Sequence, residues 1–124
     1  MIAYQFPENL EDRGYKIFPE DLEKARNIYF HGTSEINFES ILQGGFKILG
    51  DVPSLSFSNE SSLALRYACE KRDALSPNGV VLAIQYPQDL DFIKHESFGI
   101  HVYRTDIQPQ IIGYCIIPKD YQHF

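Results

Sequence analysis

The sequence predicts an α+β domain with a largely antiparallel sheet and short flanking helices. Helix and strand patterns alternate over the first two thirds of the chain, and the last third carries strand patterns alone. Neighbouring parallel strands need a crossover connection of a dozen or more residues, so this strand-rich end disfavours a doubly wound parallel sheet. With 124 residues the chain can bury one core, and we expect a single domain over 1–124.

The amino-terminal part, residues 1–26, is expected to form a covering arm followed by a short helix. The arm shows no clear hydrophobic periodicity. In the run FPEDLEKARN, Pro19 and acidic residues come first, and Lys24 and Arg26 come last. That order of charges suits a helix dipole, so a short helix is predicted here. Residues 27–117 are then expected to form the core.

The core is expected to begin with a buried strand and an amphipathic helix. The run NIYFHG places apolar and aromatic residues before a glycine, which predicts a strand that ends at His31 and Gly32. In NFESILQGGF, apolar residues recur at helical spacing. A good N-cap residue, Asn37, precedes them, and Gly44 and Gly45 follow. A helix of about two turns is predicted.

Two strands and a second helix are predicted next. The run SLSFS alternates Leu55 and Phe57 with serines, as a half-buried strand does. The helix that follows has Ala64, Tyr67 and Ala68 on one face. The run GVVLAIQYP has the continuous β-branched character of a strand that is buried on both faces.

The last third is predicted to consist of strands. One is expected over residues 100–103, followed by a turn through Gln108 and Pro109. The run IIGYCII then predicts a closing strand.

Composition excludes several classes of protein. The net charge of −6 disfavours passive binding of nucleic acid, because neutralising phosphates requires clustered Lys and Arg. No stretch approaches the length of an apolar membrane span, so no membrane partner is expected and a cytoplasmic location is predicted. Cys69 and Cys115 lack the spacing of metal ligands, and we expect reduced thiols and no metal.

The motif HGTS is the first candidate for a functional site. His31 is a titratable group beside Gly32, where a backbone can approach a ligand closely, and Thr33 and Ser34 add two hydroxyls. Taken alone, the motif is more typical of an ordinary turn in which Ser34 or Asn37 caps the next helix.

The segments that follow HGTS in the chain make a functional role for this motif more specific. YFHGTS is followed by FESILQGGFK, LSFS, the ALRYA helix, VVLAIQY and DIQPQIIGY. This succession resembles the ADP-ribosyltransferase superfamily, in particular its poly(ADP-ribose) polymerase-like (histidine-tyrosine-glutamate) branch, in the form of a small microbial or phage-type single domain. The resemblance covers roughly residues 29–117, and it implies an ADP-ribosyltransferase-like fold with a split sheet.

The resemblance implies that NAD⁺ is held as a co-substrate. In that family the histidine hydrogen-bonds the ribose next to nicotinamide, the glycine clamps the carboxamide, and a tyrosine stacks on the nicotinamide ring. An aromatic face suits a flat cationic ring. The NAD-binding residues implied here are His31, Gly32, Thr33, Ser56, Phe57, Ser58 and Tyr67. Ser56 stands where the family usually has a second tyrosine.

The catalytic carboxylate is the weakest match. The family's glutamate orients the ribose 2′-hydroxyl and stabilises the oxocarbenium character that grows as the glycosidic bond breaks. Its expected place is near residues 98–100, and none of these is acidic. Glu96 is the nearest carboxylate upstream and Asp106 the nearest downstream. The catalytic set implied is therefore His31 with Glu96, with Asp106 or with neither.

The expected function is NAD-dependent mono-ADP-ribosyl transfer to a macromolecule. A protein acceptor is favoured over a nucleic acid because the chain lacks Arg-rich segments, and the same lack disfavours a tRNA 2′-phosphotransferase. Two alternatives stay open: a non-catalytic module that binds NAD⁺, ADP-ribose or a protein, and a glycohydrolase toxin that depletes NAD⁺. Delivery of the protein into a host or target cell as an effector also stays open.

Overall fold

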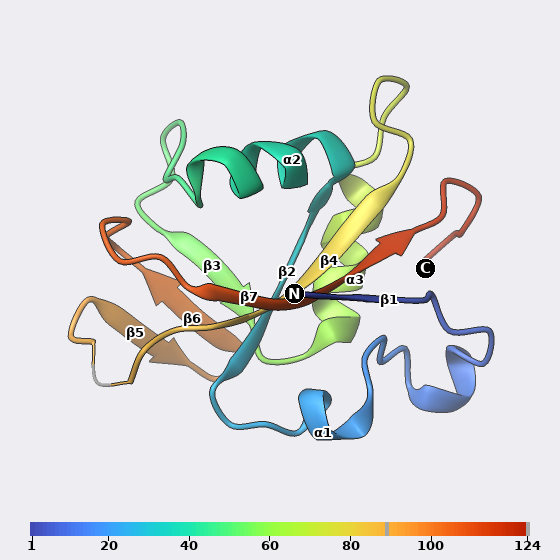
Figure 1. Cartoon of the computed structure of the whole chain (residues 1–124), viewed down its shortest axis with the longest axis horizontal. Helices are drawn as coiled ribbons and strands as arrows, with labels where there is room; N and C mark the ends of the chain where they lie inside the picture. The colour runs from blue at the N-terminus through green and yellow to red at the C-terminus, as the bar shows by residue number, and fades with distance from the viewer. Residues whose placement is uncertain (89, 124) are drawn as a thin grey trace.

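The computed structural model describes residues 1–88 and 90–123 (Figure 1). In chain order its elements are β1 (Ile2–Tyr4), a 3₁₀ turn (Glu11–Arg13), α1 (Glu20–Glu23), β2 (Ile28–Ser34), α2 (Glu35–Gly44), β3 (Leu55–Ser58), α3 (Ser61–Glu70), β4 (Gly79–Gln85), β5 (Ile93–Glu96), β6 (Gly99–Val102) and β7 (Gln110–Ile117). None of the helices in these ranges is both long and apolar enough to cross a membrane.

The strands form one seven-stranded sheet in the order β1-β7-β4-β2-β3-β6-β5. β1 runs parallel to β7, and the other pairings in this order are antiparallel. The expectation of an α+β domain with a largely antiparallel sheet is therefore confirmed.

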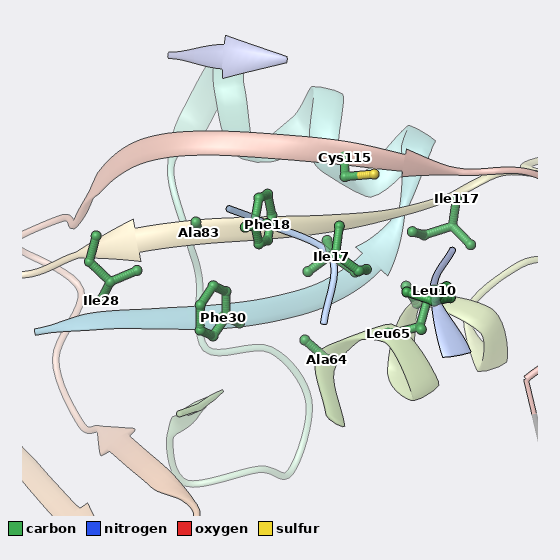
Figure 2. Close-up of a cluster of buried hydrophobic side chains, with 12 residues drawn as sticks. Leu10, Ile17, Phe18, Ile28, Phe30, Ala64, Leu65, Ala83, Cys115 and Ile117 are labelled. Carbon is green, nitrogen blue, oxygen red and sulfur yellow. The ribbon is translucent and has the colours of Figure 1, made fainter. Parts of the chain in front are cut away.

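The inner strand β4 separates two apolar cores. Side chains of a strand alternate between its faces. Val81 and Ala83 join the first core, which includes Phe18, Phe30 and residues of α3 (Figure 2). Leu82 and its alternating neighbours join the second core, beside α2. Burial of β4 on both faces confirms what its continuous apolar run predicts.

The sheet parts between β2 and β3. β2 pairs with β4 along its whole length, from Ile28 to Ser34. It pairs with β3 at a single position, Phe30 with Ser58. Past this position toward the end of β2 the two strands share no register, and Figure 1 shows β3 turning away from β2. The parting leaves room between the strands, and it positions the site described below.

Several boundaries differ from those that the sequence predicts. β2 continues two residues past Gly32, and α2 begins at Glu35, because Ser34 is its N-cap and accepts a hydrogen bond from the amide of Asn37 at 3.2 Å. The predicted N-cap at Asn37 is therefore wrong. α1 has only four residues, and β1 and β5 were not predicted at all. Both cysteines are free, as expected.

Candidate functional site

A pocket of about 440 Å³ opens where β2 and β3 part. Its walls come from β2, β3, α3 and the turn between β5 and β6. The lining residues used below are His31, Gly32, Ser56, Tyr67, Lys71 and Phe98. His31 and Tyr67 are 36 positions apart in the chain, yet they line one open space.

His31 bridges the two strands. Its Nδ1 lies 3.4 Å from the carbonyl oxygen of Ser56 on β3. The rings of Phe46 and Phe57 pack against the imidazole, each with its centroid 5.4 Å from the imidazole centroid. These contacts fix the imidazole at the bottom of the gap between the strands, and one part of it stays open to the pocket.

The imidazole of His31 is neutral near pH 7. Burial among the aromatic rings lowers the pKa of His31 from its ordinary 6.5 to about 4, and the nearby Lys71 ammonium also lowers it. The Ser56 carbonyl acts in the opposite direction but more weakly than burial. A neutral imidazole offers one N–H donor and one acceptor nitrogen, which suits hydrogen bonds with hydroxyl groups.

Gly32 is required by packing against α3. A Cβ atom built on Gly32 would lie 1.9 Å from the carbonyl oxygen of Ala64 and 2.6 Å from the amide nitrogen of Ala68. Glycine therefore lets α3 lie directly on β2. This contact brings Tyr67, one helical turn beyond Ala64, to the wall of the pocket, where its side chain stays about half exposed.

The other residues predicted from the LSFS segment differ in what they offer to a ligand. Ser58 is buried, and its hydroxyl donates to the carbonyl oxygen of Glu60 at 2.8 Å, so it secures the start of α3. Phe57 is buried in the second core and also borders the pocket. Ser56 lines the pocket and is exposed.

A second hollow of about 450 Å³ adjoins the first and shares His31, Gly32 and Lys71 with it. It is the more polar of the two, because hydroxyl and amide side chains from β2 and α2 line it together with Lys47. Thr33 lies here and not in the first pocket, and its Oγ1 accepts a hydrogen bond from Asn37 Nδ2 at 2.6 Å.

The charged side chains that line this cleft differ in sign from the net charge of the chain. Among the described residues, no Asp or Glu lines either hollow, whereas Lys47 and Lys71 do. The chain as a whole carries a net charge of −6. The described residues of the cleft walls therefore offer an anionic group two cations and no carboxylate.

A glutamine from the loop between β6 and β7 holds Phe46 against His31. The Oε1 of Gln108 accepts from the amide nitrogen of Phe46 at 2.7 Å. Its Nε2 donates to the carbonyl oxygens of Phe46 at 3.0 Å and Thr105 at 2.8 Å. The Gln108 side chain thus hydrogen-bonds both the amide nitrogen and the carbonyl oxygen of Phe46, as the backbone of a neighbouring strand would.

Glu96 lies one strand away from the pocket. It is the last residue of β5 and pairs in register with Gly99, which itself pairs with Ser58. Paired residues share a sheet face, so Glu96 projects from the same face as Ser58, with no side chain at Gly99 between them. Its Oε1 lies 3.6 Å from Lys94 Nζ, and Glu96 is not among the residues that line the pocket.

Asp106 is held elsewhere. Its two carboxylate oxygens accept from Arg104 Nε at 3.0 Å and from Arg104 Nη2 at 2.6 Å. This pairing lowers the pKa of the Asp106 carboxyl, and the pair is exposed to solvent. Asp106 does not border the pocket. Of the two carboxylates predicted, only Glu96 projects from a strand that is linked in register to the pocket wall.

At the place where the family's glutamate is expected, the structure has no acid. Phe98 and Ile100 line the pocket there. A Cβ built on Gly99 between them would lie 1.9 Å from the carbonyl oxygen of Phe57, so no side chain fits on this backbone.

Sequence reasoning missed two residues that line the site, Lys71 and Lys47, and a third, His101, that contacts Ser56. One feature of the sequence could have pointed to Lys71: it is a cation at the end of the helix that carries Tyr67. Lys47 follows the paired glycines after α2 and carries no motif. His101 gave no signal, because its contact with Ser56 depends on the register of β6 with β3.

Within residues 1–88 and 90–123, no group of three or more His, Cys, Asp or Glu side chains could hold a metal ion. Comparison with protein-family models, with curated proteins and with solved structures gave no match to this chain. What the cleft binds has to be inferred from the side chains that line it.

Proposed function

We propose that the protein binds NAD⁺ in this cleft and transfers a single ADP-ribose to a macromolecular acceptor. The observation that carries the proposal is the convergence of His31, Gly32 and Tyr67 on one open pocket. These are the residues that the resemblance to ADP-ribosyltransferases assigns to the nicotinamide end of NAD⁺.

The chemistry of the walls suits the nicotinamide end. Nicotinamide in NAD⁺ is a flat cationic ring, and the half-exposed Tyr67 offers it an aromatic face. The pKa of His31, lowered to about 4 by burial, keeps the imidazole uncharged, so it does not repel the pyridinium. A neutral imidazole can also hydrogen-bond the hydroxyls of the adjoining ribose.

The second hollow suits the diphosphate. Lys71 borders both hollows and Lys47 borders the second one. A dinucleotide with its pyridinium beside Tyr67 would bring its diphosphate toward these two cations. Because the described residues place no carboxylate on either wall, the attraction to phosphate is not opposed there.

Glu96 is the carboxylate proposed for the transfer step. Its place on the sheet face of Ser58, across the bare Gly99, leaves a path toward the pocket once the Lys94 contact is released. There the carboxylate would accept a hydrogen bond from the ribose 2′-hydroxyl and stabilise the positive charge that develops on the ribose.

The test compares three measurements on purified protein: NAD⁺ binding by calorimetry, release of nicotinamide, and transfer of labelled ADP-ribose to proteins of a cell extract. We expect all three for the wild type. Glu96→Gln should bind NAD⁺ normally and lose about 10²-fold or more in nicotinamide release. Asp106→Asn, with its carboxylate already engaged by Arg104, should match the wild type. Absence of NAD⁺ binding would overturn the proposal.

A second function is favoured by one observation, the apolar side chains of Phe98 and Ile100 at the family's catalytic position. With no acid there, the domain would be a non-catalytic module that holds NAD⁺ or ADP-ribose. NAD⁺ binding without nicotinamide release over hours would establish this module. Release without transfer would identify an NAD⁺ glycohydrolase instead.

A further inference from the structure

Ser56, on the wall of the pocket, forms a hydroxyl–imidazole pair with His101 of the neighbouring strand β6. The Oγ of Ser56 lies 3.0 Å from His101 Nδ1, within the range expected of a nucleophile and its base. We propose that Ser56 is an internal acceptor of ADP-ribose, with His101 as the base that receives its proton. This inference rests on the proposed function, and it names an acceptor for that activity.

The strand register creates the pair. Ser56 of β3 and His101 of β6 are partners in the antiparallel ladder, so their side chains lie side by side on one sheet face. That face also carries Ser58 and Phe30, which line the pocket. His101 Nδ1 meets a second hydroxyl, that of Ser54, at 3.3 Å. With its ring proton on Nε2, His101 presents an acceptor to both serines.

Ser56 stands apart from the other serines of this segment. The Ser58 hydroxyl is buried and donates to backbone oxygens, and no base lies beside it among its hydrogen-bond partners. Ser54 is farther from His101 than Ser56 is. Ser56 is exposed in the pocket, and His101 is the partner of its hydroxyl. It is therefore the best-placed nucleophile of the three.

Ser56 also lies beside the group that is proposed to hold the ribose. Its own carbonyl oxygen is 3.4 Å from His31 Nδ1. A ribose that is hydrogen-bonded to His31 would therefore place its anomeric carbon C1″ in the pocket that Ser56 also lines. This is the carbon at which the glycosidic bond to nicotinamide breaks.

The transfer balances without any further reactant. The Ser56 Oγ forms a bond to C1″ while the bond from C1″ to the nicotinamide nitrogen breaks. The electron pair of the broken bond stays on that nitrogen, so nicotinamide leaves as a neutral molecule. The hydroxyl proton of Ser56 moves to His101 Nδ1 and passes from there to solvent.

The experiment uses the full chain with NAD⁺ and reads the intact mass, followed by fragmentation to locate the adduct. The wild type should gain the mass of one ADP-ribosyl group on Ser56. Ser56→Ala should lose this gain. Ser97→Ala, in the β5–β6 turn outside the pocket, is the matched control and should be modified like the wild type.

The variant His101→Gln tests whether His101 acts as a base or only holds Ser56 in position. Glutamine keeps a hydrogen-bond acceptor beside Ser56 but takes no proton at neutral pH, so a structural role would survive the change. We expect the rate of modification to fall about 10²-fold in both His101→Gln and His101→Ala. Modification of His101→Gln at the wild-type rate would overturn the role of His101 as a base.

Two outcomes separate this inference from the proposed function. If labelled ADP-ribose reaches proteins of the extract but the chain itself gains no mass, or if the adduct lies on Ser54, Ser56 is not the acceptor and the proposed activity still stands. If NAD⁺ does not bind at all, the proposed function fails and the inference fails with it.

Discussion

The imidazole of His31 spans the parting between β2 and β3, with its Nδ1 3.4 Å from the carbonyl oxygen of Ser56. β2 and β3 share one register position, so this contact is one of the few that tie the walls of the pocket together. The properties of this histidine, and of the residues around it, lead to four predictions.

The buried His31 should make stability depend on pH. Its pKa is about 4 in the folded chain and 6.5 ordinarily, so between these values the unfolded chain binds more protons. The unfolding free energy should be fully present above pH 6.5 and should fall by roughly 3 kcal/mol as the pH drops to 4. Urea titrations at several pH values measure it. His31→Gln should flatten this part of the profile, and an unchanged slope would contradict the assignment.

Gly32→Ala should destabilise the fold strongly. The added methyl group would meet the backbone of α3 at 1.9 Å, and a helix backbone cannot yield as a flexible side chain can. We expect a loss of about 3 kcal/mol or more in the unfolding free energy, measured by urea denaturation. Gly44→Ala is the matched control, because its methyl group would meet only the movable end of Lys47. Equal stability of the two variants would contradict the packing described.

Tyr67→Leu should weaken NAD⁺ binding and leave the fold intact. Tyr67 is 48% exposed, so the loss of its ring should change the unfolding free energy by less than about 0.5 kcal/mol. The loss of an aromatic face for the pyridinium should raise the Kd for NAD⁺ about tenfold. Tyr103→Leu is the control, because Tyr103 is 46% exposed but does not line the pocket. Calorimetry that shows equal binding by both variants would remove Tyr67 from the site.

Lys71→Gln should weaken binding of the diphosphate of NAD⁺ but not binding of nicotinamide. Loss of the cation shared by both hollows should weaken NAD⁺ binding a few-fold, by about 1 kcal/mol, and reduce its dependence on salt. Binding of free nicotinamide, which carries no phosphate, should be unchanged. The exposed Lys119→Gln serves as the control. If both ligands weakened equally, Lys71 would be acting on the shape of the pocket and not on phosphate.

The sequence was sufficient for the parts of the fold that depend on local pattern. The apolar run of β4 and the helical spacing around Tyr67 each correspond to an element that the structure contains. β1 and β5 were missed because they are short, and β5 is only partly buried, so neither shows a full alternation of apolar and polar residues.

The site depends on register as well as on pattern, and a single sequence does not specify register. His31 and Tyr67 could be predicted to converge through a family resemblance. The contact of Ser56 with His101 follows from how β3 aligns with β6. The place of Glu96 follows in turn from how β5 aligns with β6. A shift of one residue in either pairing would move these side chains to the opposite face.

The pairing of Gln108 with Phe46 links the loop after β6 to the histidine of the cleft. Phe46 packs edge-on against His31, and the Gln108 amide holds the Phe46 backbone at both its nitrogen and its oxygen. Deamidation of Gln108 to glutamate would replace the Nε2 donor with a carboxylate oxygen that faces two carbonyl oxygens. Chemical ageing at this one position, outside both hollows, would therefore loosen the aromatic wall that keeps His31 uncharged.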